Sequence, residues 1–128
     1  TRRSSDLIRL LGPRPDGSPW ELGIVHPRND QGAVASMNLC TGAVATSGDY
    51  ERFIVVDGER YCHILNPLTL QPVRYWQSIS VVAPVCTAAG AMSTIAMLLQ
   101  EKAPSFLQEQ GVMWLGVDRN GQIVEHAP

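Results

Sequence analysis

A polar, glycine-containing loop and a histidine stand at the two ends of one expected β-hairpin. Thr46, Ser47 and Gly48 precede the β-rich run 52–56, and His63 lies in the second β-rich run, 59–65. Because a short hairpin brings its ends side by side, we expect the hydroxyls and the imidazole to share a pocket. Hydroxyls beside a glycine offer donors and an accessible backbone N–H, a usual way to hold a phosphate. Histidine titrates near neutral pH and suits a general base.

Two threonines of the alanine-rich segment 87–99 are further candidates. The composition of this segment predicts a helix, with Thr87 as its N-cap. A helix N-terminus attracts anions, so Thr87 is a candidate diphosphate ligand. Thr94 could ligate a hard cation through its hydroxyl.

Each candidate also has a structural interpretation. Residues 46–48 have the composition of a polar turn, and His63 could be a hydrogen-bonded strand residue. The helix hydroxyls could bond back to the preceding helical turn. From the residues alone, the functional and structural interpretations both remain open.

The composition sets limits on the class of protein. A chain of 128 residues is long enough for one domain with a core, and we predict a single domain over 1–128. The net charge of −2 gives no case for nucleic-acid binding. No apolar run approaches the roughly 20 residues that a transmembrane helix needs. No signal peptide is visible at Thr1, and the localisation cannot be read from the sequence.

Three dispersed cysteines, Cys40, Cys62 and Cys86, form no CxxC pair. A zinc site is therefore not expected, and we predict three buried free thiols.

The pattern of apolar runs and turn residues predicts an α+β fold. It consists of a largely antiparallel β-sheet with β-hairpins, packed against one long buried helix and a short second helix at 104–110. Asp57-Gly58 and Asn120-Gly121 lie between apolar runs and predict tight turns. Strands are expected at 6–11, 20–26, 52–56, 59–65, 78–83, 112–117 and 122–125. Residues 33–45 form either one bent strand or two strands broken at 41–42.

Taken in order, several of these segments together resemble the ApbE family, the flavin transferases also called FAD:protein FMN transferases. The resemblance runs from about residue 6 to residue 122. The segments that carry it are 15–24, 43–52, 63–67, 72–73 and 87–94. Each segment is weak alone, but their order and spacing are specific.

The resemblance implies a reaction and roles for the candidate residues. FMN would be transferred from FAD to a Thr or Ser hydroxyl of a partner flavoprotein, with Mg²⁺ on the diphosphate and AMP as the leaving group. Thr46, Ser47, Gly48 and Thr87 would bind the cofactor. His63 would assist deprotonation of the acceptor, and Thr94 would ligate the metal.

The chain departs from the family pattern at several positions. Gly90 stands where the family has a metal-binding Asp, so the resemblance implies an impaired cation site. Asn66 replaces a frequent Asp, and Leu68 and Leu70 replace a basic residue and a Gly. No counterpart of the family's N-terminal half occurs, so the chain resembles the C-terminal half. It is either a fragment or a short paralogue, with the missing half or a second copy as a further partner.

Three functions remain open at this point. The first is an ApbE-like transferase domain. The second is a non-catalytic FAD- or nucleotide-binding module that assists flavoprotein maturation or electron transfer. The third is a structural or interaction domain without a ligand. The family is often periplasmic or membrane-anchored, which the resemblance alone does not transfer to this chain.

Overall fold

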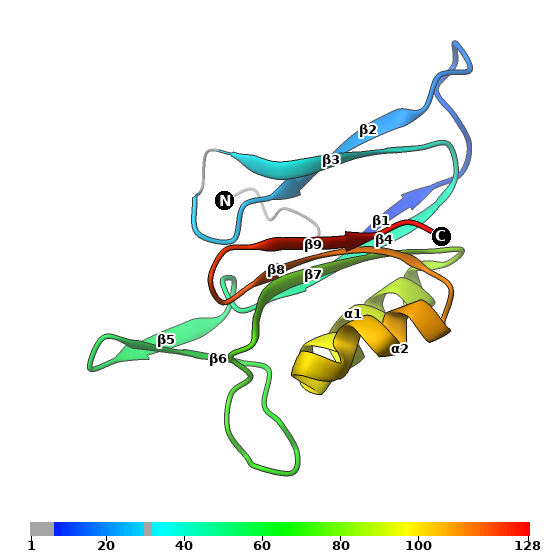
Figure 1. The fold of residues 1–128 in the computed structure, drawn as a ribbon. Coiled ribbons are helices and arrows are strands. Elements are labelled where there is room, and N and C mark those ends of the chain that lie inside the picture. The colour runs from blue at the N-terminus through cyan, green and yellow to red at the C-terminus, as the bar shows by residue number, and fades with distance from the viewer. Residues whose placement is uncertain (1–6, 30–31) are drawn as a thin grey trace.

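The computed structural model describes residues 7–29 and 32–128. Its centre is a five-stranded antiparallel sheet with the order β1-β4-β7-β8-β9 (Figure 1). These strands are β1 (Leu7–Leu10), β4 (Gly42–Gly48), β7 (Trp76–Ala83), β8 (Met113–Asp118) and β9 (Ile123–His126). The middle strand, β7, is buried along nearly its whole length, in keeping with its β-branched and aromatic residues.

Helices cover one face of this sheet (Figure 1). α1 (Cys86–Leu99) packs on β4 and β7, and the short helix η1 (Gln100–Lys102) leads into α2 (Ala103–Glu109). α1 buries Ala89, Ser93, Ala96 and Met97, a helical spacing of small residues that allows the helix to approach the strands closely. The core between these layers includes Ile79, Val81, Leu107 and Trp114.

A two-stranded ribbon covers the opposite face. β2 (Trp20–Val25) pairs with β3 (Ala33–Leu39) outside the central sheet. Ile24 and Met37 of the ribbon pack on Leu115 and Val117 of β8. The central sheet is therefore enclosed between the ribbon and the helices.

A hairpin projects away from these layers (Figure 1). β5 (Phe53–Val56) pairs with β6 (Glu59–Cys62), and the predicted Asp57-Gly58 turn joins them. Both turn residues have positive φ angles, 51° and 78°, as a type I′ turn requires. All four β5 side chains are exposed, by 41% to 65%.

The α+β class, the antiparallel sheet, the long helix and the short second helix are confirmed. The segment 33–45 forms two strands rather than one, and they belong to different sheets. The predicted strand residue 6 and the turn residues 30–31 lie outside the described part of the chain.

Three local expectations at the candidate residues are wrong. Thr46, Ser47 and Gly48 end strand β4 rather than forming a loop, because β4 stays paired with β7 as far as the Gly48–Ser78 pair. His63 follows β6 instead of lying within it. Thr87 is not the N-cap of α1, which begins one residue earlier with Val85 as its cap.

The cysteine expectation holds in part. All three thiols are free, but only Cys62 is buried, while Cys86 is half-buried and Cys40 is exposed. Cys40 is exposed because it lies in the connection between β3 and β4, outside both sheets.

Candidate functional site

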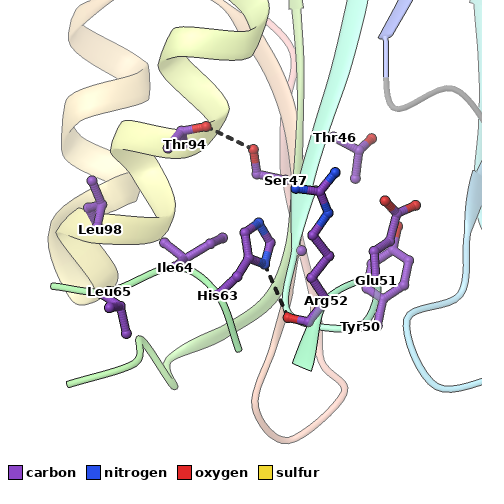
Figure 2. A pocket seen from close by; sticks show the side chains of 11 residues that line it. Thr46, Ser47, Tyr50, Glu51, Arg52, His63, Ile64, Leu65, Thr94 and Leu98 are labelled. Atoms are coloured by element: carbon purple, nitrogen blue, oxygen red, sulfur yellow. Dashed lines mark hydrogen bonds between the residues drawn. The ribbon is translucent and has the colours of Figure 1, made fainter. Parts of the chain in front are cut away.

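A pocket of about 440 Å³ opens where the end of β4, the base of the β5–β6 hairpin and α1 meet (Figure 2). Its lining residues are Thr46, Ser47, Gly48, Tyr50, Glu51, Arg52, His63, Ile64, Leu65, Thr94 and Leu98. Five of the six predicted site residues are among them. The sixth, Thr87, is exposed on α1 about two helical turns before Thr94 and does not line this pocket.

The pocket has two walls of different origin (Figure 2). One, here called the helix wall, consists of Ser47 on β4 and Thr94 on α1, with Ser93 behind them. The other, here called the hairpin wall, consists of residues 50–52 and His63 at the base of the hairpin. The ionisable groups, a glutamate, an arginine and a histidine, all belong to the hairpin wall.

Three hydroxyls are joined in the helix wall. Ser47 Oγ lies 2.8 Å from Ser93 Oγ and 3.2 Å from Thr94 Oγ1. Ser93 is fully buried and donates to the backbone carbonyl of Gly90 at 3.0 Å. The helix therefore reaches the end of β4 through hydrogen bonds as well as through apolar packing.

His63 is held by one backbone carbonyl. Its backbone N–H donates to the Arg52 carbonyl oxygen at 3.0 Å, and its ring Nδ1 lies 3.2 Å from the same atom. A carbonyl can only accept, so this contact places the proton of the neutral ring on Nδ1 and leaves a lone pair on Nε2. Figure 2 shows the second ring nitrogen on the side of the ring that faces Ser47. This is the tautomer that a general base needs.

Thr46 and Ser47 do not present their hydroxyls together. Adjacent residues of a strand point to opposite faces of a sheet, and Figure 2 shows the two side chains diverging. Thr46 Oγ1 lies 2.7 Å from Ser80 Oγ, on the ribbon side of the sheet. Thr46 borders the pocket, but its hydroxyl already has a partner on that far side.

Gly48 is needed for a close approach. A Cβ at this position would overlap the ring of Tyr50 and lie 3.1 Å from the carbonyl oxygen of Gln77. The ring of Tyr50, which lines the pocket, therefore lies directly against the strand end at Gly48.

An ion pair fixes the point where β4 leaves the sheet. Arg28, in the turn after the ribbon strand β2, makes two contacts of 2.6 Å with the carboxylate of Asp49. Asp49 is buried, and its backbone N–H donates to the Gln77 carbonyl at 3.0 Å. Such a two-point arginine–carboxylate pair is strong and directional, so it orients the residues that follow Gly48.

The helix wall offers only neutral ligands for a cation. Within residues 7–29 and 32–128, no group of three or more His, Cys, Asp or Glu side chains could hold a metal ion. Hydroxyl oxygens are of the kind that hard cations accept, but they carry no charge. Gly90 lies one helical turn before Thr94, and a Cβ there would meet only Leu7 Cδ2 at 3.7 Å. A Cβ therefore fits at this position, where the sequence lacks a carboxylate.

Sequence reasoning did not find every group in the site. Ser93 was considered only as a helix serine, and Tyr50, Glu51 and Arg52 were not assigned roles. The Arg28–Asp49 pair was missed because its residues lie 21 positions apart, one in the turn after β2 and the other directly after β4. Two signals pointed to residues 49–52: they directly follow Gly48, and they lie in the segment 43–52 that carries the family resemblance.

Comparisons with known proteins agree on one family. A family model described as the ApbE family matches residues 4–115. A curated FAD:protein FMN transferase of Klebsiella pneumoniae is 32% identical over 114 residues, covering 87% of this chain and 33% of that protein. That of Vibrio cholerae is 38% identical over 98 residues, covering 74% of this chain and 29% of that protein.

A solved structure also matches closely. The ApbE protein from Thermotoga maritima aligns with a TM-score of 0.86 and 38% identity, over 93% of this chain and 40% of that chain. This chain thus spans about a third of the length of the curated relatives that it matches. Among the described residues, no helix is both long and apolar enough to cross a membrane.

Proposed function

This chain belongs to the ApbE family, and on that premise we propose that it takes part in transferring FMN from FAD to a Thr or Ser hydroxyl of a partner flavoprotein. The observation that carries the proposal is the meeting of Ser47, His63 and Thr94 in one pocket. These residues come from β4, the segment after β6, and α1, so only the fold brings them together.

The chemistry is phosphoryl transfer with a protein hydroxyl as the nucleophile. The acceptor oxygen forms a bond to the FMN phosphorus, the bond from that phosphorus to the bridging oxygen breaks, and AMP leaves. His63 Nε2 takes the proton of the acceptor hydroxyl, since Nδ1 is committed to the Arg52 carbonyl. Arg52, on the same wall, is placed to attract the negatively charged diphosphate.

Mg²⁺ is part of this proposal, with Thr94 as its protein ligand. When bound, the ion would neutralise charge on the diphosphate. The hydroxyls of the helix wall fit a hard cation in kind, while Gly90 leaves the wall without a carboxylate. We therefore propose a weak cation site in this chain alone.

The pocket also needs more than these residues. The matched relatives are about three times as long as the matched region, so they contain further polypeptide beyond it. We propose that a further polypeptide, either a missing N-terminal half or a second copy of the chain, completes the FAD site here.

A second function is favoured by Gly90. Without a carboxylate beside Thr94, the chain could bind FAD or a nucleotide without transferring FMN. It would then act as a non-catalytic module in flavoprotein maturation or electron transfer.

One assay separates these functions. The chain is incubated with FAD, Mg²⁺ and a flavoprotein domain that carries an acceptor threonine, and the acceptor is weighed by mass spectrometry. His63→Gln is the matched variant, and a parallel arm adds the unmatched part of the Thermotoga maritima relative. We expect the acceptor to gain one FMN in at least one arm, and the variant to lose this gain.

FAD binding without transfer in both arms would instead favour the non-catalytic module. If the chain neither transfers FMN nor binds FAD in either arm, both proposals fail and an interaction domain remains.

A further inference from the structure

The β5–β6 hairpin has an edge, here called the outer edge, on the side of β5 away from β6. Within residues 7–29 and 32–128, β5 pairs with β6 alone, so this edge adjoins no other strand. The His63 N–H donates to the Arg52 carbonyl, which shows that the backbone groups of Arg52 face the β6 side. Residues of an antiparallel strand point their N–H and C=O alternately toward and away from the partner strand. The backbone groups of Phe53 and Val55 therefore point outward.

The outer edge lacks the side chains that usually protect an exposed strand. Natural proteins commonly place lysine or another charged residue, a proline or a bulge on such an edge. β5 instead consists of Phe-Ile-Val-Val, pairs with β6 in a regular register, and exposes all four side chains. A regular apolar edge of this kind is suited to bind an extended segment of another polypeptide by β-augmentation.

The outer edge leads directly to the pocket. Residues 50–52, which form part of the hairpin wall, run into Phe53 without a break. A strand added to β5 would lie two strand spacings, about 10 Å, from the segment after β6 that carries His63, and three extended residues span that distance. A segment paired with β5 can therefore turn across residues 50–52 and reach the pocket within a few residues.

The size of the outer edge favours a transient partner. A strand of four residues is about 13 Å long. Stable complexes usually bury about 800 Å² on each partner, which is far more than one edge of so short a strand provides. β5 alone is therefore too small to hold a permanent second copy of the chain, but it suits a partner that binds, reacts and leaves. The proposed transfer requires one such partner, the flavoprotein that receives FMN.

From this geometry we propose that the outer edge of β5 docks the acceptor flavoprotein. An extended segment of the acceptor pairs with the outward backbone groups of Phe53 and Val55 and leads its target Thr or Ser into the pocket. The paired part of this segment is apolar, because its side chains lie beside the exposed apolar side chains of β5. The inference rests on the proposed flavin function and adds the acceptor's docking surface and the kind of segment that the acceptor presents.

Amide hydrogen exchange, followed by NMR, tests the inference without a substitution in this chain. The probe is a flavoprotein domain whose acceptor threonine is replaced by valine, so that it binds in the presence of FAD and Mg²⁺ but is not modified. We expect the amides of Phe53 and Val55 to exchange fast in the chain alone and at least about 10-fold more slowly in the complex. The amides of Ile54 and Val56, which face β6, should change less.

Two substitutions at one position separate backbone pairing from side-chain packing. Val55→Pro removes an outward N–H and leaves the bonds to β6 in place, because an edge strand accepts proline where its N–H faces solvent. Val55→Thr is the matched control, since it keeps both the N–H and the β-branched shape. Val55→Pro should raise the KM for the unmodified acceptor domain by roughly 5- to 10-fold, the strength of one backbone hydrogen bond, while Val55→Thr stays within about 2-fold.

FAD affinity should be the same in both variants and in the unaltered chain, which shows that the pocket is intact. An unchanged KM in Val55→Pro would overturn the inference. If Val55→Pro fails to fold, amide exchange in the unaltered chain decides alone.

Other occupants of the outer edge give different results. Amides of Phe53 and Val55 that are protected in the chain alone, and less so on dilution, would assign the edge to a second copy. Protection on adding the unmatched part of the Thermotoga maritima relative, without the acceptor, would assign it to the remaining polypeptide. Either result overturns the inference. FMN transfer with no protection at Phe53 and Val55 also overturns it but leaves the proposed function standing, whereas neither transfer nor acceptor binding in any arm overturns both.

Discussion

The two walls of the pocket differ in charge, in hydrogen bonding and in exposure to solvent. The helix wall is neutral: Ser47 is hydrogen-bonded to the fully buried Ser93 between β4 and α1, and Thr94 is hydrogen-bonded to Ser47. The hairpin wall carries Glu51, Arg52 and His63, all exposed, on a segment that leaves the central sheet. Buried hydrogen bonds thus lie in the helix wall and charged side chains in the hairpin wall, and substitutions can test whether stability and proton transfer separate in the same way.

The largest expected effect is on chemistry at the hairpin wall. His63→Gln should lower the rate of FMN transfer by about 10²- to 10⁴-fold, the usual contribution of a positioned general base. Because His63 is exposed, the free energy of unfolding should change by no more than about 0.5 kcal/mol. Transfer is followed by mass spectrometry and stability by urea denaturation. If the free energy of unfolding fell by as much as the activation free energy of transfer rose, stability and catalysis would not depend on separate walls.

The next effect concerns the junction between the walls. Asp49→Asn should lower the free energy of unfolding by about 1–3 kcal/mol, because Arg28 loses its charged partner beside a buried position. FAD affinity should fall as well, since Asp49 directly follows Gly48. Arg28→Lys is the matched variant: it keeps the charge without the two-point geometry and should lie in between. If Asp49→Asn bound FAD as tightly as the unaltered chain, the Arg28–Asp49 pair would support the fold but not the FAD pocket.

A third change adds charge to the neutral helix wall. Gly90→Asp should raise the affinity for Mn²⁺ by roughly 10- to 100-fold if Thr94 faces a cation, a gain on the scale reported for groups that support metal sites. Gly90→Ala is the control, because its Cβ meets only Leu7. It should raise stability by about 0.5–1 kcal/mol through helix propensity and leave Mn²⁺ affinity unchanged. Titration calorimetry with Mn²⁺ and FAD distinguishes the two variants.

The smallest effect lies further out on the hairpin. Hydrogen bonds from Arg74 and Tyr61 lower the pKa of Glu59 below its ordinary value of 4.5. A lowered folded pKa means that the pair stabilises the protein above pH 4.5 and that this contribution fades as the pH falls below it. Both groups are exposed, so the effect is small. An NMR titration of Glu59 in Arg74→Gln should give a higher pKa than in the unaltered chain.

The sequence predicted which distant residues lie close together better than it predicted the direction of their side chains. The Asp57-Gly58 turn and the two flanking apolar runs correctly placed His63 near the end of β4, because hairpin signals are local. The expected helix offered Thr94 as a candidate 31 residues further along, and the family resemblance assigned it to the same site. Which hydroxyls face the pocket depends on how far β4 stays paired with β7, and that register follows from long-range packing. Thr46 therefore looked equivalent to Ser47, although it faces Ser80.

Burial was equally hard to predict for single polar residues. Ser93 resembled an ordinary helix serine, yet it connects α1 to β4. Thr87 looked like a helix start, but α1 begins one residue before it and leaves it exposed. A helix boundary is set by the turn that precedes it, and cap preferences fix it only to within a residue or two.

The projecting β5–β6 hairpin has a practical consequence. In the described part of the chain β5 pairs only with β6, so its other edge and four apolar side chains face solvent. An uncovered apolar edge of this kind is a template for strand addition by neighbouring molecules, and it makes concentrated samples prone to aggregate. A lysine on the solvent side, as in Ile54→Lys, is how natural proteins discourage such growth, and it would make the protein easier to handle in solution.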